Sequence, residues 1–138
     1  NFFENDPTLS LVNGVKELIQ FLHKQNLTLV LASSSAMVNI NRVFSRFDLN
    51  KYFTAKISGA DLTASKPHPE IFLNAAKVLQ CLPSQCIVIE DALKGLSAAK
   101  AAGMSCIIIR NQLNQKIDFS EADLTFSNLS SFLNILKF

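Results

Sequence analysis

The sequence predicts an α/β domain in which a parallel β-sheet lies between two layers of helices. Its 138 residues, 49% of them hydrophobic, provide enough chain for one substantial core. Short apolar runs without polar alternation are typical of strands that are buried on both faces. These runs alternate with amphipathic segments of roughly 10 to 12 residues, a pattern that indicates βαβ units. We therefore expect a three-layer α/β/α, Rossmann-like architecture.

Apolar spacing predicts five helices. Ser35 is expected to cap the second, and Pro69 to stand in the first turn of the third, where Glu70 favours the positive helix end. The fourth is rich in alanine and is expected to stop at Gly103 in a left-handed conformation, and the last spans Leu129–Leu136. The apolar faces expected for the first three are Val15, Leu18, Ile19 and Leu22; Ile40, Val43, Phe44 and Phe47; and Phe72, Ala75, Ala76 and Leu79.

Apolar runs between these helices predict the strands. The expected strands are Leu27–Leu31, Ala55–Ser58, Cys86–Ile89, Ser105–Ile109 and Asp123–Phe126. In parallel sheets of this kind, ligands bind at the carboxyl ends of the strands. The polar residues that follow each strand are therefore the candidates for a functional site.

Composition excludes several classes of partner. The chain has 13 basic and 11 acidic residues, a surplus of +2 that indicates no nucleic-acid partner. No apolar run approaches the roughly 20 residues that a membrane span requires. The three cysteines show no Cys-x-x-Cys spacing, and no signal peptide is visible. We therefore expect a cytoplasmic protein without disulfides or a cysteine metal site.

A serine turn and a lysine follow two of the predicted strands. Ser33-Ser34-Ser35 stands between a strand and a helix start, where hydroxyls and unpaired N–H groups can bind an anion. The alternative is a turn in which Ser35 only caps its helix. Lys66 precedes Pro67, which favours an extended conformation and suits a fixed ammonium beside a phosphoryl group. The alternative for Lys66 is a solvated loop lysine.

Glu90-Asp91 is the strongest single feature of the sequence. Two adjacent carboxylates directly after a buried strand need water or a cation, and oxygen ligands of this kind suit Mg²⁺. Gly95 would let the backbone approach this pair closely. The alternative is a structural ion pair with a nearby lysine such as Lys94.

Three ordered segments carry a family resemblance. Leu31–Ser35, Ser65–Phe72 and Ile87–Met104 resemble the second, third and fourth motifs of the haloacid dehalogenase superfamily. The most similar subgroup is the β-phosphoglucomutase-like phosphatases. The resemblance runs from about Val12 to the end of the chain.

The resemblance implies an Mg²⁺-dependent phosphatase or phosphomutase that acts on a small phosphorylated metabolite such as a sugar phosphate. Ser33 would hydrogen-bond the phosphoryl oxygens beside the Ser34 backbone N–H, and Lys66 would balance charge. Asp91 would ligate Mg²⁺, with Glu90 as a second ligand or acting through water. By the same resemblance, the histidine two residues after the lysine is expected to be a loop residue rather than a catalyst.

The first motif of the family, Asp-x-Asp on a central strand, has no counterpart here. None of the six aspartates belongs to such a pair. We therefore expect the nucleophile, the central strand and most of the helical cap to lie outside this chain. Residues 1–11 resemble only the exit of the cap, and 12–138 a partial core. By itself the chain is expected to be inactive, and its sheet to be completed by a missing N-terminal segment or a homo-oligomer partner.

Two other functions remain open from the residues. A relative that lost its nucleophile would be a phosphate- and metal-binding or interaction module. A phospho-acceptor signalling domain also combines acidic residues, a hydroxyl and a lysine at strand ends. The order Ser, Lys, Glu-Asp fits that domain poorly, because its acidic pair should come first.

Overall fold

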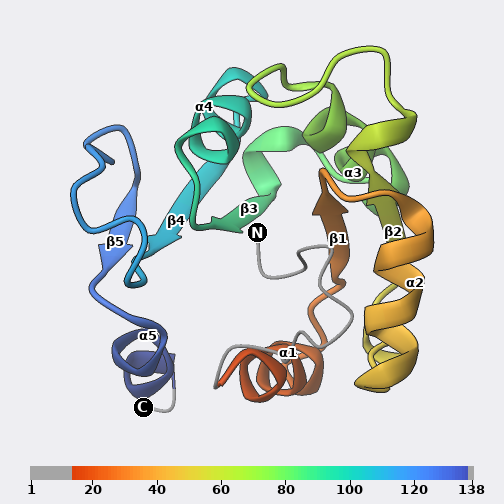
Figure 1. Ribbon diagram of the computed structural model, residues 1–138, viewed down its shortest axis with the longest axis horizontal. Coiled ribbons are helices and arrows are strands. Elements are labelled where there is room, and N and C mark those ends of the chain that lie inside the picture. The colour runs from red at the N-terminus through yellow and green to blue at the C-terminus, as the bar shows by residue number, and fades with distance from the viewer. Residues whose placement is uncertain (1–13, 137–138) are drawn as a thin grey trace.

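The computed structural model describes residues 14–136 and confirms the α/β architecture, with the strands divided between two parallel sheets (Figure 1). One sheet has the order β1-β2 and the other the order β3-β4-β5, and every pairing is parallel. The strands are β1 Val30–Ser33, β2 Ala55–Ser58, β3 Ile87–Glu90, β4 Ser105–Ile109 and β5 Leu124–Phe126.

Helices cover both faces of the strands, which gives the three layers that the sequence predicts. Figure 1 shows α3 and α4 on one side of the strands, and α1 and α5 on the other. The helices are α1 Val15–Lys24, α2 Met37–Arg46, α3 Glu70–Leu79, α4 Leu93–Ala101 and α5 Leu129–Leu136. Single 3-10 turns lie at Asn50–Tyr52, Gly59–Asp61 and Pro83–Gln85.

The core has two halves, one on each side of the strands. Along β4, Cys106 and Ile108 pack in the half that contains α3 and α4. Ile107 and Ile109 pack in the half that contains α1, α2 and α5. Successive side chains of a strand point to opposite faces, so a strand covered on both sides must be apolar throughout. This is why the run at residues 105–109 shows no polar alternation.

The first strand begins later than the sequence predicts. The amide of Leu27 donates to the carbonyl of Leu22 at 3.3 Å, so this residue still belongs to the end of α1. Leu27 is also exposed. The apolar run is therefore divided between a helix terminus and a strand that begins at Val30 and continues to Ser33.

The prediction that Ser35 caps α2 is wrong. Ala36 occupies the N-cap position, and no side chain caps the helix there. The Ser35 peptide group is used elsewhere: its N–H donates to Ser33 Oγ and its carbonyl accepts from Ser58 Oγ. Ser35 is therefore part of the turn that joins the ends of two strands.

The other predicted helix ends agree with the structure to within a residue or two. Pro69 stands at the N-cap of α3, directly before its first residue. Gly103 has φ +82°, the left-handed conformation expected after α4. The buried face of α3 includes Ile71 in addition to the predicted residues, and Leu79 is only half-buried.

Residues 1–11, expected to resemble the exit of a cap, lie outside the described residues, as does their boundary with 12–138. Within residues 14–136, no helix has the length and apolar character that a membrane crossing requires.

Candidate functional site

The carboxyl ends of β1 and β3 are joined by one lysine. Lys66 Nζ donates to the carbonyl oxygen of Ala32 at 3.3 Å and lies 3.0 Å from Glu90 Oε2. Ala32 belongs to β1 and Glu90 ends β3, so the ammonium reaches both sheets. The Lys66 and Glu90 side chains are only 11% and 10% exposed. The structure thus brings together three of the segments that the sequence singles out, and Lys66 is not a solvated loop lysine.

The loop that carries Lys66 is held at several points. The ring of Phe72 lies beneath the ammonium, 5.0 Å from Nζ to the ring centroid, and the Lys66–Pro67 peptide bond is cis. His68 Nδ1 accepts the backbone N–H of Glu70 at 3.1 Å. His68 is exposed, and this bond at the start of α3 agrees with the role of a loop residue. The lysine is thus held from the C-terminal side of the loop, by the Phe72 ring and by a loop that is bonded to the start of α3.

Glu70 also fixes the beginning of this loop. Its carboxylate accepts the backbone N–H and the hydroxyl of Thr63, at 3.1 Å and 2.7 to 3.0 Å. The hydrogen bond from the Thr63 side chain is the main reason why the pKa of Glu70 lies below its ordinary value. Glu70 therefore stabilises the loop rather than acting in the site.

The serine turn after β1 is packed against the turn after β2. Ser33 is 2% exposed, and its Oγ accepts the Ser35 N–H at 3.1 Å. Ser58, also 2% exposed, donates from Oγ to the Ser35 carbonyl at 2.6 Å. A Cβ at Gly59 would lie 3.3 Å from Ser34 Cα, so the two backbones approach closely there. The close approach places the Ser34 peptide at the shared edge of the sheet.

Ser58 is a residue that the sequence analysis missed. It pairs in register with Ser33, so both serines end neighbouring parallel strands. The rule that polar residues after a strand are candidates applies to Ser58 as much as to Ser33. Ser58 could have been recognised as a polar residue at the end of a predicted strand, but it precedes a glycine and does not belong to a run of serines.

Glu90 is paired with a lysine, but not with the one that the sequence suggested. Its Oε2 accepts from Lys66, and its Oε1 accepts the Asp91 N–H at 3.1 Å. Lys94, by contrast, is exposed. The carboxylate lies against Gly95, where an added Cβ would collide with it. The close approach predicted for Gly95 is therefore made by the Glu90 side chain.

Asp91 is held from a different loop. Asn111 Nδ2 donates to Asp91 Oδ2 at 3.2 Å, and Asn114 Nδ2 donates to the Asp91 carbonyl at 2.8 Å. Both asparagines follow β4, so they come from the carboxyl end of a neighbouring strand. The sequence analysis missed them, although both asparagines lie in the segment that follows a predicted strand and so meet its own criterion.

The donor set at this edge suits a hard cation that keeps some of its water. Within residues 14–136, no group of three or more His, Cys, Asp or Glu side chains gathers around one point. Mg²⁺ is usually bound through one or two carboxylates, with water and substrate phosphate completing its shell. Glu90 and Asp91 meet that requirement, and a closed protein cage is not needed.

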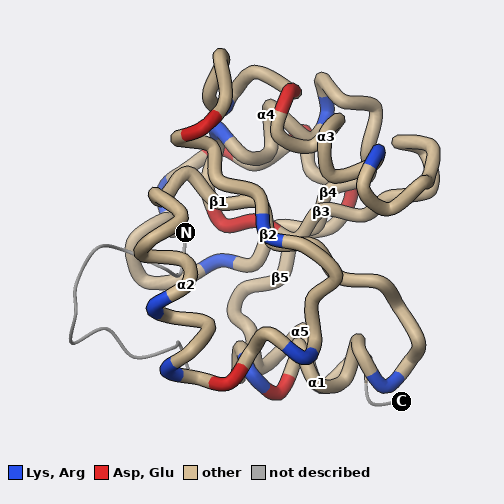
Figure 2. Tube along the Cα trace, turned by 90° about the vertical axis from the view of Figure 1, so that its right-hand side faces the viewer, with Lys and Arg blue, Asp and Glu red and all other residues tan. Residues whose placement is uncertain are grey.

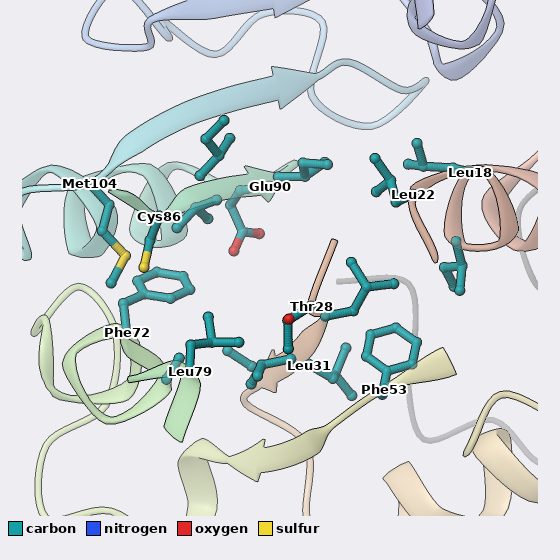
Figure 3. A pocket seen from close by; sticks show the side chains of 18 of the residues that line it. Leu18, Leu22, Thr28, Leu31, Phe53, Phe72, Leu79, Cys86, Glu90 and Met104 are labelled. Carbon is teal, nitrogen blue, oxygen red and sulfur yellow. The ribbon is translucent and has the colours of Figure 1, made fainter. Parts of the chain in front are cut away.

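An apolar cavity of about 250 Å³ separates β1 from β3. Figure 3 shows residues of β1 and the segment before it, among them Thr28 and Leu31, opposite Cys86 and Glu90 of the β3 segment. Leu18 of α1 and other apolar side chains line the same space. Within residues 14–136, neither β1 nor β3 pairs with a strand on this side. The cavity therefore lies between two strand edges.

Charges of both signs are distributed over the molecule. Figure 2 shows Lys and Arg segments interspersed with Asp and Glu segments along the trace. Two ion pairs lie well away from the Lys66–Glu90 pair in sequence: Lys51 with Asp48, and Lys100 with Asp123, each at 2.9 Å. The Lys51–Asp48 pair is largely exposed and the Lys100–Asp123 pair is partly exposed, and neither includes a residue of the site.

A family profile and curated proteins both match this sequence. The sequence profile of a family described as haloacid dehalogenase-like hydrolase matches residues 2–109. Hexitol phosphatase B of Escherichia coli K12 is 34% identical over 126 residues, which cover 91% of this chain and 57% of that protein. Beta-phosphoglucomutase of Bacillus subtilis is 38% identical over 97 residues, covering 70% and 42%.

A solved structure shares the fold of this chain. The crystal structure of CbbY from Rhodobacter sphaeroides in complex with phosphate superposes with a TM-score of 0.82 at 26% identity. The match covers 93% of this chain and 59% of that protein. The chain thus spans about half the length of the curated relatives that it matches.

Proposed function

The chain belongs to the haloacid dehalogenase-like hydrolase family, and from this we propose that it forms part of an Mg²⁺-dependent phosphatase or phosphomutase. Its substrate would be a small phosphorylated metabolite such as a sugar phosphate, the class that the names of several relatives indicate. Residues 12–138 would be part of its core domain, and its location would be the cytoplasm. Three free cysteines support that location, because reduced thiols persist there.

The observation that carries the proposal is the contact of Lys66 with both β1 and Glu90. It gathers a serine turn, an ammonium and an acidic pair at one edge of the strands. Each of these groups has a common alternative role, but their convergence suits a phosphorylated ligand. Preorganised donors and a fixed positive charge stabilise the negative charge that spreads over a phosphoryl group during transfer.

The residues of the chain would act as follows. The Ser33 hydroxyl would donate a hydrogen bond to a phosphoryl oxygen. Its Oγ also accepts the Ser35 N–H, which orients the hydroxyl. The Ser34 backbone N–H would donate to a second oxygen. Lys66 would neutralise charge on the phosphoryl group and on the attacking carboxylate.

Asp91 would hold Mg²⁺ directly, and Glu90 would contribute through water. The cation, when bound, supplies positive charge to the phosphoryl oxygens. The contact between Glu90 and Lys66 places that ammonium beside the acidic pair, so both positive charges would be available to the same phosphoryl group.

The nucleophile would be an aspartate on a strand outside these 138 residues. The cavity between β1 and β3 supports this part of the proposal, since it is apolar and flanked by two strand edges. The carboxylate would attack phosphorus and the substrate oxygen would leave with a proton from a second aspartate. Water would then hydrolyse the aspartyl-phosphate. The strand would come from an upstream segment of the same protein or from a second copy.

A second candidate rests on one sequence observation. None of the six aspartates belongs to an Asp-x-Asp pair. A protein without that pair would bind phosphate and Mg²⁺ through the same groups and would not turn over a substrate. It would be a binding or interaction module rather than an enzyme.

One experiment separates the two candidates. The complete reading frame is expressed, its intact mass is compared with the 15.2 kDa of this chain, and phosphate release from hexose and hexitol phosphates is followed with Mg²⁺ or EDTA. If the chain is part of an enzyme, the expressed protein should be heavier than 15.2 kDa. Its phosphate release should require Mg²⁺ and should be lost in Asp91→Asn. A protein of complete length that binds phosphate without any turnover would establish the binding module instead.

A further inference from the structure

The loop that follows β4 is built around one guanidinium. Arg110 Nη1 donates to the carbonyl oxygens of Asn114, Gln115 and Ile117 at 2.9, 3.3 and 3.1 Å. The guanidinium also lies over the ring of Phe119, 5.0 Å from its centroid. A loop whose carbonyls converge on a single planar cation has few alternative conformations. This loop therefore presents its side chains from a fixed backbone.

Asn111 points its amide nitrogen at the acidic pair. Its Oδ1 accepts the N–H groups of Leu113 and Asn114 at 2.8 and 3.1 Å, and its Nδ2 donates to Asp91 Oδ2 at 3.2 Å. Because two backbone donors occupy the oxygen, rotating the amide by 180° would place an NH₂ group against them. The orientation of the Asn111 amide is therefore determined by the loop, and its donor end faces Asp91.

The side chain of Asn114, which is buried, also accepts a backbone N–H through its oxygen and donates to Asp91 through its nitrogen. The residue is 4% exposed, its Oδ1 accepts the Asn111 N–H at 2.8 Å, and its Nδ2 donates to the Asp91 carbonyl at 2.8 Å. Asn114 thus joins the backbone of Asp91 to the backbone of Asn111. The carboxylate of Asp91 is held by one asparagine and its peptide by the other.

We propose that Asn111 and Asn114 are positioning residues that hold the Asp91 carboxylate in the geometry that Mg²⁺ requires. This inference rests on the proposed function, because it assigns the support of the same site. Both donors are neutral, so they orient the carboxylate without cancelling the charge that attracts a cation. A lysine at either position would compete with Mg²⁺. Hydrogen bonds to a ligand from outside the coordination shell commonly change metal affinity by about 10- to 100-fold.

The test measures Mg²⁺ affinity directly, in the protein expressed from the complete reading frame. Mg²⁺ binding is titrated calorimetrically for the parent, Asn111→Ala, Asn114→Ala and Gln115→Ala, and melting temperatures are recorded in EDTA. Gln115 is the matched control: it is an exposed residue of the same loop, and its side chain donates to the Asn111 carbonyl, at 2.6 Å, rather than to Asp91. The apparent Mg²⁺ constant and kcat at saturating Mg²⁺ are measured in parallel.

Asn111→Ala is expected to weaken Mg²⁺ binding about tenfold. Its kcat should return close to the parent value at saturating Mg²⁺, and Gln115→Ala should bind Mg²⁺ like the parent. Asn114→Ala should weaken binding at least as much and also lower the melting temperature, because it leaves buried polar groups unpaired. Unchanged Mg²⁺ affinity in Asn111→Ala and Asn114→Ala, with or without a lower melting temperature, would overturn the inference. A parent protein that does not bind Mg²⁺ at all would instead reject the proposed function.

Discussion

Lys66 Nζ lies 3.0 Å from Glu90 Oε2 and 3.3 Å from the Ala32 carbonyl oxygen, so one ammonium links the ends of two separate sheets. Both charged side chains are about nine-tenths buried. The pair therefore has a structural consequence as well as a place in the site. Removing either partner leaves a charge that has lost most of its water and its counter-ion.

Lys66→Met is expected to lower the free energy of unfolding by about 3 kcal/mol, because it leaves the Glu90 carboxylate buried without its cation. Urea unfolding measures the change. The double variant Lys66→Met, Glu90→Gln should lose less than the sum of the two single variants. Lys94→Met is the matched control, since Lys94 is exposed on the neighbouring helix, and it should be nearly neutral. Additive losses in the double variant would contradict the pairing.

Gly95→Ala should be destabilising although alanine is the better helix former. A Cβ at this position collides with the Glu90 carboxylate, so the side chain of Glu90 must move and its bond to Lys66 must lengthen or break. The expected loss is about 1 to 3 kcal/mol, again measured by urea unfolding. Ser97→Ala, at an exposed position of the same helix, should be neutral or slightly stabilising. A stabilised Gly95→Ala would show that Glu90 does not occupy this position.

Ser33 and Ser34 offer a comparison within one turn. In the protein expressed from the complete reading frame, Ser33→Ala should lower kcat/KM for a phosphorylated substrate by about 100-fold, the scale of losing one preorganised donor. Ser34→Ala should leave kcat/KM nearly unchanged, because the proposed donor there is the backbone N–H. Equal losses in the two variants would mean that the Ser33 hydroxyl has no specific role.

The three thiols should differ strongly in reactivity. Burial raises the pKa of Cys106 to about 12 and raises that of Cys86 above its ordinary value, whereas Cys81 is exposed. The thiolate is the reactive form, so at pH 8 iodoacetamide should modify Cys81 first. Peptide mass spectrometry locates the label, and all three thiols should react in denaturant. Cys81→Ser should abolish the fast reaction. Rapid modification of Cys106 in the folded protein would contradict the burial.

Asp123 should make stability depend on pH in the acid range. The hydrogen bond from Lys100, with a further one from the Cys106 N–H, lowers the pKa of Asp123 in the folded protein. The unfolded chain, with a pKa of about 4, then binds the proton more readily. The contribution of Asp123 is therefore present above about pH 4 and is lost as the pH falls through the lower, folded pKa.

Asp123→Asn should accordingly melt below the parent protein at pH 7, by a constant difference down to about pH 5. The difference should shrink as the pH falls below about 4. Thermal melts across this range measure it, and Lys100→Met should show the same trend because it removes the first partner of Asp123. A difference that does not change between pH 7 and pH 3 would contradict this account.

Much of the fold was predictable because it depends on local patterns. β2, β4 and α5 begin and end at the predicted residues, since an apolar run or an amphipathic repeat determines each of them. The start of β1 was not predictable in this way. The peptide of Leu27 bonds back to α1, and nothing in the apolar character of the segment distinguishes a helix terminus from a strand.

The type of each element, and the placement of Ser33, Lys66 and the acidic pair at or after strands, were readable from the chain alone, because they follow from neighbours in the sequence. Tertiary structure decided which of these groups meet. Glu90 pairs with Lys66, which is 24 residues away, and not with Lys94, and Asp91 is held by Asn111, 20 residues further on. Such contacts depend on strand order and on the packing of loops at one edge of the sheets, and no local periodicity encodes either of these.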